Sequence, residues 1–351
     1  MGLQNTPFKI GRGKSGAKNL ITDVPGVTVG HVTLQDGDRM CTGVTAVLPH
    51  GGDLFHDKVM AASCVFNGYG KTTGLVQVDE LGTIEAPIVL TNTLSVGTAA
   101  TAVVRYMMER NPDIGREAGT VNPVVCECND GSLNDIRALY VKEEHVLGAI
   151  ENCADTFEEG AVGAGTGMCC LGFKGGIGSA SRIVVLDGKE YTVGALVLSN
   201  FGSAGRLMID GRPVGLEVQE AMAETPDKGS IIMLIATDIP LTERQLKRVA
   251  RRAGVGLSRT GSYMGNGSGD IAIAFTTANR LPHTSDKAIL PLSMVLDDEL
   301  DPVFDMTAEA VEEAIVSSLW HAETTHGRDG RVMQGFREAW EKYFQAKNSK
   351  S

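Results

Sequence analysis

The sequence has 351 residues, of which 42% are hydrophobic and 21% are charged, so it can form a sizeable buried core. Its net charge of −11 argues against a nucleic-acid-binding function, because binding to phosphates requires a basic surface. The first twenty residues lack an apolar core of signal-peptide length, and no stretch is apolar enough to cross a membrane. We therefore expect a cytoplasmic protein that binds neither nucleic acid nor membranes.

Strand-like and helix-like segments alternate along the whole chain, which predicts a single α/β domain covering residues 1–351. Short apolar runs bounded by turn residues predict strands at 27–32, 43–48, 59–66, 87–90, 124–128 and 191–199. Helical spacing of apolar residues predicts helices at 97–109, 142–153, 242–253, 307–322 and 335–347. The helix at 242–253 is the clearest, since Thr242 and Gln245 form a capping box and Gly254 is expected to end it.

Basic, cysteine and histidine residues give no sign of a nucleic-acid or metal site. None of the seven cysteines lies in a CxxC pair, and His321 and His326 are too far apart for an HExxH motif. We expect reduced thiols, no metal and no organic cofactor. The densest basic run is expected to form a solvated helix face and consists of Arg244, Lys247, Arg248, Arg251 and Arg252.

Two glycine-rich segments resemble nucleotide sites but lack required residues. The sequence Gly70-Lys71-Thr72 resembles the end of a P-loop, yet Val65 stands where that motif needs glycine. The segment at 172–178 lacks the strand, G-x-G-x-x-G and helix order of a dinucleotide fold. Structural turns, or one wall of a small-molecule pocket, are the favoured interpretation.

The sequence PDKGSIIML at 226–234 places a polar turn directly before an apolar strand that begins at Ser230. Cleavage between Gly229 and Ser230 would put a serine hydroxyl and a new α-amino group on one residue. Such an amine has a pKa of roughly 8 and can accept the proton of a hydroxyl that is otherwise a weak nucleophile. Gly229 permits strained backbone angles and leaves its carbonyl open to attack. Taken alone, however, a Gly-Ser dipeptide is more typical of an ordinary turn before a strand.

A second glycine-rich segment, at 260–270, ends in Ser268-Gly269-Asp270 and is followed by an apolar run. Ser268 and Asp270 occupy alternate positions, so both side chains would face one site if the segment is extended. A hydroxyl and a carboxylate there could hold an amino-terminal amine and relay protons. An ordinary turn with an exposed Asp270 explains the residues equally well.

These residues, with others along most of the chain, resemble the DmpA-type L-aminopeptidase/D-esterases, which include the β-peptidyl aminopeptidases. The matching blocks are collinear. They are ITDVPGVTVGH (21–31), LTNTLSVG (90–97), ECNDGSLND (127–135), VGAGTGM (162–168), FKGGIGSASR (173–182), SNFG (199–202), KGSIIMLIATD (228–238), GNGSGD (265–270) and AETTHGRDG (322–330).

The resemblance implies an αββα four-layer sandwich that cleaves itself into fragments 1–229 and 230–351. It further implies a homo-oligomer, with a tetramer favoured, that acts on short peptides, amides or esters without a cofactor. By position, Ser230 matches the nucleophile, and Ser268 and Asp270 match its supporting serine and acid. Asn200 matches an asparagine that donates to the oxyanion, and Glu127 matches an acid that pairs with the substrate ammonium group. Some members carry a tyrosine near this acid, where this sequence has Asn129.

Three alternatives remain at the level of the sequence. An acyltransferase or amidase could use the same self-processing scheme, although the related ornithine acetyltransferases use threonine where this chain has Ser230. A β-peptidyl or ω-amino amide hydrolase would differ only in the shape of its pocket. A non-catalytic binding homologue would keep the fold and leave the bond between Gly229 and Ser230 intact.

Overall fold

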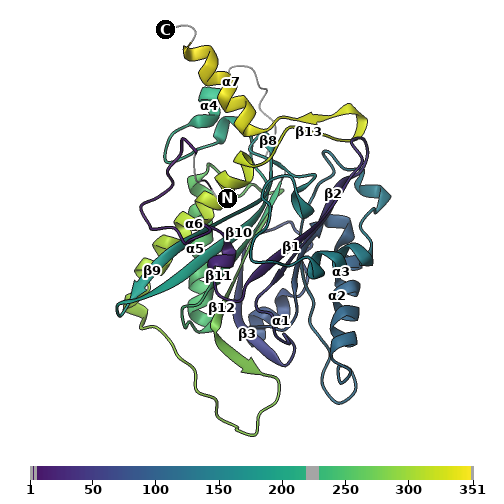
Figure 1. Cartoon of the computed structure of the whole chain (residues 1–351), viewed down its shortest axis with the longest axis vertical. Helices are drawn as coiled ribbons and strands as arrows, with labels where there is room; N and C mark the ends of the chain where they lie inside the picture. Colours follow the sequence, from purple (N-terminus) through teal and green to yellow (C-terminus); the bar gives the residue numbers. More distant parts are fainter. Residues whose placement is uncertain (1–2, 4–5, 219–228, 349–351) are drawn as a thin grey trace.

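Two β-sheets lie at the centre of the fold (Figure 1). The computed structural model describes residues 3, 6–218 and 229–348. In order across the sheet, the smaller one contains β1 (Thr28–Gln35), β2 (Cys41–Leu48), β5 (Ile88–Asn92) and β6 (Val124–Cys128). The larger one contains β4 (Thr83–Ile84), β3 (Asp57–Gly68), β12 (Gly269–Pro282), β11 (Ser230–Thr237), β10 (Lys189–Asn200) and β9 (Gly176–Leu186).

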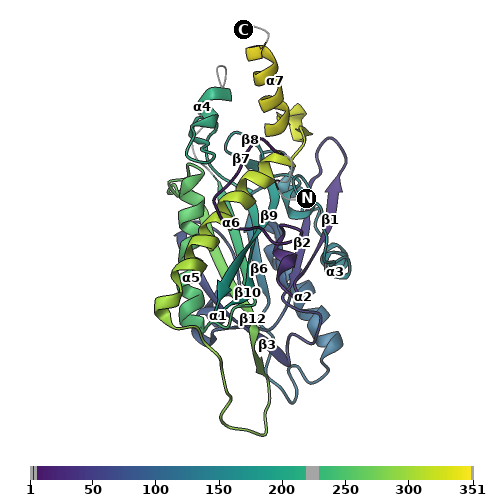
Figure 2. The same ribbon diagram turned by 60° about the vertical axis from the view of Figure 1, so that its left-hand side comes forward.

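Helices cover the outer face of each sheet. The smaller sheet is covered by α2 (Val96–Arg110) and α3 (Glu143–Glu151), and the larger one by α5 (Glu243–Arg259) and α6 (Asp301–Trp320) (Figure 1). The shorter helices and hairpins are α1 (Leu75–Leu81), α4 (Val214–Val218), β7 (Cys169–Cys170), β8 (Phe173–Lys174), β13 (Thr325–His326) and β14 (Val332–Met333). At one end, α7 (Phe336–Asn348) projects beyond the sheets beside α4 (Figure 2). The 3₁₀ turns are Ile21–Asp23, Thr93–Ser95, Ile136–Ala138, Gly163–Gly165, Ala204–Arg206, Asp297–Glu299 and Arg328–Gly330.

Three separate apolar clusters fill the spaces between these layers. One joins α5 and α6 to the larger sheet, the second lies between the two sheets, and the third joins α2 and α3 to the smaller sheet. Three clusters between four layers make an αββα sandwich, so the fold expected from the resemblance is confirmed. Because both faces of the larger sheet are covered, all eight residues of β11 are buried, which explains its almost unbroken apolar sequence.

The structure contains all the expected strands and helices within the described residues but changes several boundaries. Gly254 does not end its helix, since α5 continues to Arg259. A Cβ at Gly254 would lie 2.6 Å from the ring of Phe66, so this glycine serves close packing against β3. The expected start of α6 at Thr307 is wrong by six residues, because the helix begins at Asp301 with a proline in its first turn. β9 was not among the expected strands, because its glycine- and serine-rich start hides its apolar pattern.

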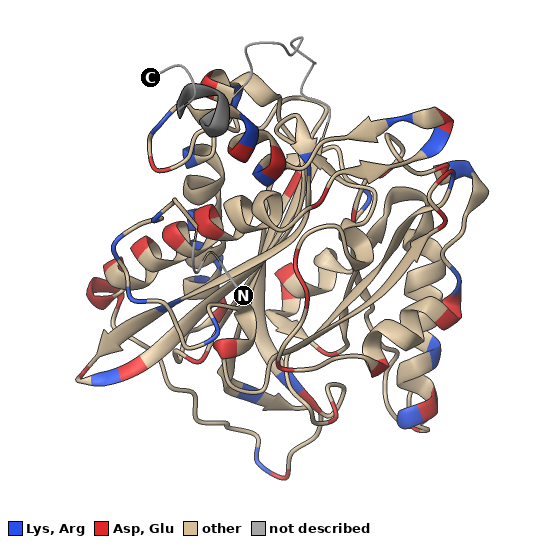
Figure 3. Ribbon diagram, turned by 45° about the horizontal axis from the view of Figure 1, so that its top comes forward, with Lys and Arg blue, Asp and Glu red and all other residues tan. Residues whose placement is uncertain are grey.

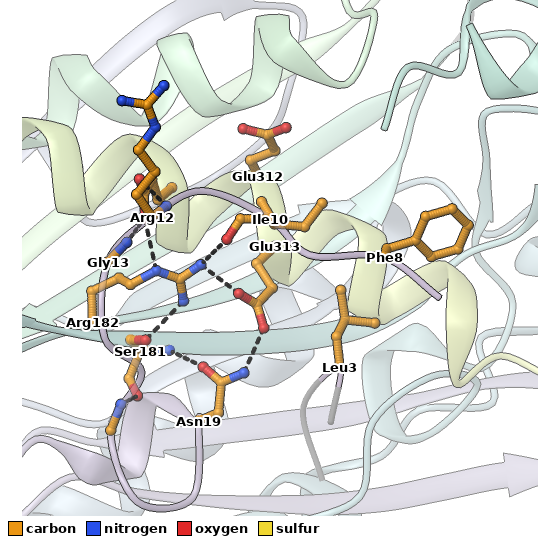
Figure 4. Close-up of polar contacts among 12 residues, drawn as sticks. Leu3, Phe8, Ile10, Arg12, Gly13, Asn19, Ser181, Arg182, Glu312 and Glu313 are labelled. Atoms are coloured by element: carbon orange, nitrogen blue, oxygen red, sulfur yellow. Dashed lines mark hydrogen bonds and ion pairs between the residues drawn. The ribbon is translucent and has the colours of Figure 1, made fainter. Parts of the chain in front are cut away.

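A buried arginine anchors the amino-terminal segment against α6 (Figure 4). Arg182 of β9 donates to Glu309 at 3.0 Å, to Glu313, and to the backbone carbonyl of Ile10 at 2.8 Å. Asn19 donates to the second oxygen of Glu313. Removing one partner of such a buried ion pair typically lowers the free energy of unfolding by about 3–5 kcal/mol. This cluster therefore holds the segment from Ile10 to Asn19 on the sandwich.

Basic and acidic positions are interspersed over the fold (Figure 3). The basic run on α5 forms the expected polar face: Arg244 and Arg248 pair with Asp297, and Lys247 pairs with Asp79. None of the helices within the described residues is long and apolar enough to span a membrane.

Candidate active site

Three strand ends of the larger sheet meet at Ser230. It is the first residue of β11 and lies opposite Asn200, the last residue of β10, and Gly269, the first residue of β12. Only 8% of Ser230 is exposed. The expectation that this serine begins a rigid central strand is confirmed, whereas the expected turn at 226–228 lies outside the described residues.

The Ser230 hydroxyl is held beside the preceding peptide bond. Its Oγ donates to the Gly229 carbonyl oxygen at 2.8 Å. The Gly269 N–H lies 3.2 Å from Ser230 Oγ and 3.3 Å from the Gly229 oxygen, so it donates to both. A Cβ at Gly229 would lie 2.0 Å from the carbonyl oxygen of Asn200, so only glycine fits there. The arrangement places a nucleophile, a carbonyl group and a hydrogen-bond donor at one point.

Ser268 and Asp270 lie together behind this point. Ser268 Oγ donates to Asp270 Oδ1 at 2.7 Å, and both residues are buried. The simple turn with an exposed Asp270 is therefore wrong. Neither residue is among those that line the cavity in front of Ser230.

A cavity of about 760 Å³ opens in front of Ser230. Gly229, Ser230, Asn200, Glu127 and Asn129 all line it, so the structure brings these five expected site residues together. The other lining residues are Tyr69, Lys71, Thr93, Gly131, Ser132, Cys169, Gly172, Phe201, Gly202, Gly267, Arg331 and Met333. Gly172 lines this cavity, so the first residue of the glycine-rich segment at 172–178 forms part of a pocket wall, one of the two interpretations of that segment.

Glu127 presents a buried carboxylate to this cavity from the end of β6. Its Oε1 accepts the Lys71 N–H at 2.7 Å, and its Oε2 accepts the Thr93 hydroxyl. Only 2% of the residue is exposed. Backbone and hydroxyl donors of this kind orient the carboxylate without neutralising its charge, so it remains suited to a cationic ligand.

The Asn200 side chain is held at both ends. Its Oδ1 accepts the Cys169 N–H at 2.9 Å, and its Nδ2 donates to the Asn129 carbonyl at 3.0 Å. The Asn129 side chain is exposed and accepts the Gly131 N–H at 2.9 Å. Asn129 thus contributes its backbone to the site, and the tyrosine that lines the cavity is Tyr69, which follows β3.

The sequence matches the model of peptidase family S58 over residues 19–333. The chain belongs to this family. It is 42% identical over 346 residues to the β-peptidyl aminopeptidase BapA of Sphingosinicella microcystinivorans. The aligned region covers 92% of this chain and 86% of that protein. The PH0078 protein of Pyrococcus horikoshii superposes with a TM-score of 0.94 at 55% identity, with 98% of both chains covered. The L-aminopeptidase D-Ala-esterase/amidase of Ochrobactrum anthropi, described as a variant of the Ntn hydrolase fold, superposes with a TM-score of 0.89 at 39% identity and 96% coverage of both chains.

The S58 chain is thus a hydrolase of the N-terminal-nucleophile type, and its resemblance to the DmpA-type enzymes is confirmed. Membership of this hydrolase family argues against the alternative of a non-catalytic binding protein. Within the described ranges, no cluster of three or more His, Cys, Asp or Glu side chains could hold a metal ion.

Sequence reasoning missed several residues of this S58 site. Tyr69 and Lys71 lie after β3, where Gly70-Lys71-Thr72 was interpreted as a structural turn or a pocket wall without any residue being assigned to the site. Thr93 lies inside the block at 90–97 that carried the family resemblance, and Cys169 directly follows the block at 162–168, but neither contact, with Glu127 or with Asn200, was expected. No local pattern indicated Arg331, which enters the cavity from the β13–β14 hairpin.

Proposed function

We propose that this chain cleaves itself between Gly229 and Ser230 and then works as an aminopeptidase with Ser230 as nucleophile. One observation carries the proposal. A serine at the start of a buried strand places its hydroxyl 2.8 Å from the carbonyl oxygen of the preceding glycine, at the wall of a cavity that also contains Glu127 and Asn200.

In the self-cleavage step, Ser230 Oγ attacks the Gly229 carbonyl carbon. The Oγ–C bond forms, the C–N bond breaks, and the hydroxyl proton moves to the nitrogen, which becomes the α-amino group of Ser230. Water then hydrolyses the ester and leaves a carboxylate on Gly229. Negative charge that develops on the Gly229 oxygen is stabilised by the Gly269 N–H, 3.3 Å away.

The two fragments, 1–229 and 230–351, are proposed to stay together as one domain. β11 begins the second fragment and pairs with β10 of the first along eight residues. The same strands are covered by α5 and α6 on one face and by the smaller sheet on the other. Separating the fragments would expose both apolar clusters, so a cut at this loop leaves the sandwich intact.

For substrate hydrolysis, the free α-amino group of Ser230 accepts the hydroxyl proton as Oγ attacks the substrate carbonyl. The amine later returns that proton to the leaving group, and water then hydrolyses the acyl-enzyme ester, which releases the acyl group as an acid and restores the Ser230 hydroxyl. Asn200 Nδ2 and the Gly269 N–H are proposed to stabilise the oxyanion, and their position beside Ser230 supports this role. The hydrogen-bonded pair of Ser268 and Asp270 is proposed to hold this amine in position.

Glu127 is proposed to bind the ammonium group of the substrate, which would restrict the enzyme to free amino termini. The relatives are named for β-peptides, L-amino acids and D-alanine esters or amides, so the substrates we propose are short peptides, amides or esters. A β-peptidyl preference is the favoured alternative, because three similar proteins are named as β-aminopeptidases. A β-residue lengthens the distance between ammonium and carbonyl by one carbon, so the shape of the cavity decides the preference.

A cytoplasmic homotetramer is also proposed. Cys41, Cys126 and Cys128 are buried free thiols, as expected in a reducing compartment. The segment between β12 and α6 projects from the fold (Figure 2) and exposes 86% of Ile289 and 73% of Leu296. Exposed apolar side chains on one projecting segment support burial against another copy of the chain.

The test is an intact-mass and denaturing-gel measurement of the purified chain and its Ser230→Ala variant. We expect fragments 1–229 and 230–351 from the unmodified chain, the smaller one beginning Ser-Ile-Ile-Met, and a single inactive chain of 37.1 kDa from the variant. The control is Ser258→Ala, an exposed serine on α5, which should be cleaved normally. Normal cleavage of Ser230→Ala would disprove the assignment.

A further inference from the structure

Lys174 is a buried cation to which the proposed chemistry assigns no role. Its side chain is fully buried, and no carboxylate lies within ion-pair distance of it in the described part of the chain. The ammonium group instead donates to the carbonyls of Gly165 at 2.9 Å, Met168 at 2.8 Å and Gly175 at 2.7 Å. Burying an ammonium group costs several kcal/mol, and here burial lowers the pKa of Lys174 to about 8. An apolar side chain at this position would avoid the free-energy cost of burying a charge. The three hydrogen bonds are therefore what a lysine provides here and an apolar residue does not.

These hydrogen bonds hold the hairpin that forms one wall of the cavity. Lys174 lies in β8, directly opposite Cys169 in β7. Leu171 and Gly172 turn the chain with positive φ angles of 48° and 77°. A Cβ at Gly172 would lie 2.1 Å from the Ala204 side chain, so the turn is pressed closely against its neighbour. Lys174 draws the carbonyls before and after this hairpin towards one point.

The hairpin supplies one of the two hydrogen bonds that orient the Asn200 amide, the one to its oxygen. The Cys169 N–H donates to Asn200 Oδ1, and Cys169 directly follows Met168, whose carbonyl Lys174 holds. With Oδ1 fixed, Nδ2 donates one hydrogen to the Asn129 carbonyl and keeps its second hydrogen for another acceptor. A rotated amide would present an oxygen to the reacting carbonyl and would repel the oxyanion.

We propose that Lys174 is a positioning residue that acts through the Cys169 N–H to keep the Asn200 amide oriented as an oxyanion donor. This inference rests on the proposed function and assigns a reason for the FKGG sequence at 173–176. An oxyanion donor acts in the transition state, so loss of its orientation lowers kcat and leaves KM nearly unchanged. If Lys174 only stabilised the fold, its substitution would lower the melting temperature. Its effect on kcat would then be the same with and without the Asn200 side chain.

A double-mutant cycle with Lys174→Met and Asn200→Ala tests this proposal. Rates are measured on a small aminoacyl amide and normalised to the cleaved fraction of each protein. We expect Asn200→Ala to lower kcat by about 100-fold and Lys174→Met by at least about tenfold, with KM unchanged. In the Asn200→Ala background, Lys174→Met should lower kcat less than about twofold, because the group it positions is gone.

Two further variants keep the result interpretable. Lys174→Gln keeps N–H donors for some of the three carbonyls and replaces Lys174→Met in the cycle if that variant does not fold. Its decrease in kcat should be smaller and should also disappear in the Asn200→Ala background. Lys14→Met removes a lysine whose side chain is 70% exposed and should leave all rates unchanged. Self-cleavage should persist in every variant, because the Gly229 oxygen has its own donor at Gly269.

The outcomes separate the two proposals. Equal losses from Lys174 substitution in both backgrounds, or a change in KM alone, would overturn the positioning role while the unmodified protein remains active. An unmodified protein that is neither cleaved nor active would instead disprove the proposed function itself.

Discussion

Replacement of Gly229 by alanine tests whether the geometry around the cleavage site is required. An added Cβ would lie 2.0 Å from the Asn200 carbonyl oxygen, 2.5 Å from Phe201 Cα and 2.9 Å from the Asn200 carbonyl carbon. Ordinary contacts begin near 3.4 Å, so backbone must move by about 1 Å or more. All three atoms belong to the β10 strand end and the residue after it, and they cannot yield as a flexible side chain would. We expect a loss of about 1–3 kcal/mol in the free energy of unfolding.

The effect on self-cleavage should be larger than the effect on stability. A displacement of about 1 Å between reacting groups can lower a rate by about 100-fold, so the Gly229→Ala precursor should persist on a gel after the unmodified chain is fully cleaved. Gly97→Ala is the matched control, because Gly97 is exposed on α2 and a Cβ there meets nothing within 4 Å. It should cleave normally and gain about 0.5–1 kcal/mol of stability. Cleavage of Gly229→Ala at the unmodified rate, with an unchanged melting temperature, would refute the steric reasoning.

Two further predictions concern charge. Glu127→Gln should lower kcat/KM for substrates with a free amino group by about 10- to 100-fold, because it removes a charged hydrogen bond, and should spare hydroxy-ester analogues; equal losses for both would remove the ammonium-binding role. Burial lowers the pKa of His31 from 6.5 to about 4, so the unfolded chain binds more protons between these pH values. Stability should therefore fall as pH decreases from about 6.5 to 4, by up to about 3 kcal/mol, and His31→Gln should flatten that slope in denaturant titrations. An identical slope in the variant would show that other groups are responsible.

The position of Ser230 at the start of a buried strand was predictable because its signal is local. An unbroken apolar run directly after Gly-Ser predicts a buried strand that begins at the serine, and β11 begins at Ser230. The GNGSGD block likewise placed Ser268 and Asp270 on one extended segment, where they are hydrogen-bonded to each other. Glu127 and Asn200 entered only through the family resemblance, since nothing adjacent to either residue indicates a catalytic site.

Two of the differences from the expected elements, at Gly254 and at the start of β9, share one physical origin. Gly254 has the properties of a helix stop, but tertiary packing against Phe66 requires a residue without a side chain inside α5. The start of β9 contains small residues because neighbouring backbone approaches closely: a Cβ at Gly176 would lie 1.9 Å from the Gly160 carbonyl. Local propensity therefore failed where glycine serves contacts that are distant in the sequence.

By itself, the sequence determined most of the longer strands and helices, the buried strand at Ser230 and the family to which its motifs point. These features depend on residues next to one another along the chain. Only the tertiary structure decided which residues donate hydrogen bonds around the cavity. The Cys169 N–H donates to Asn200, and the Lys71 N–H and the Thr93 hydroxyl donate to Glu127. Lys174 donates to the Met168 carbonyl, next to the cavity wall. Those contacts depend on the register of paired strands and on loops that close over them, which short-range patterns do not specify.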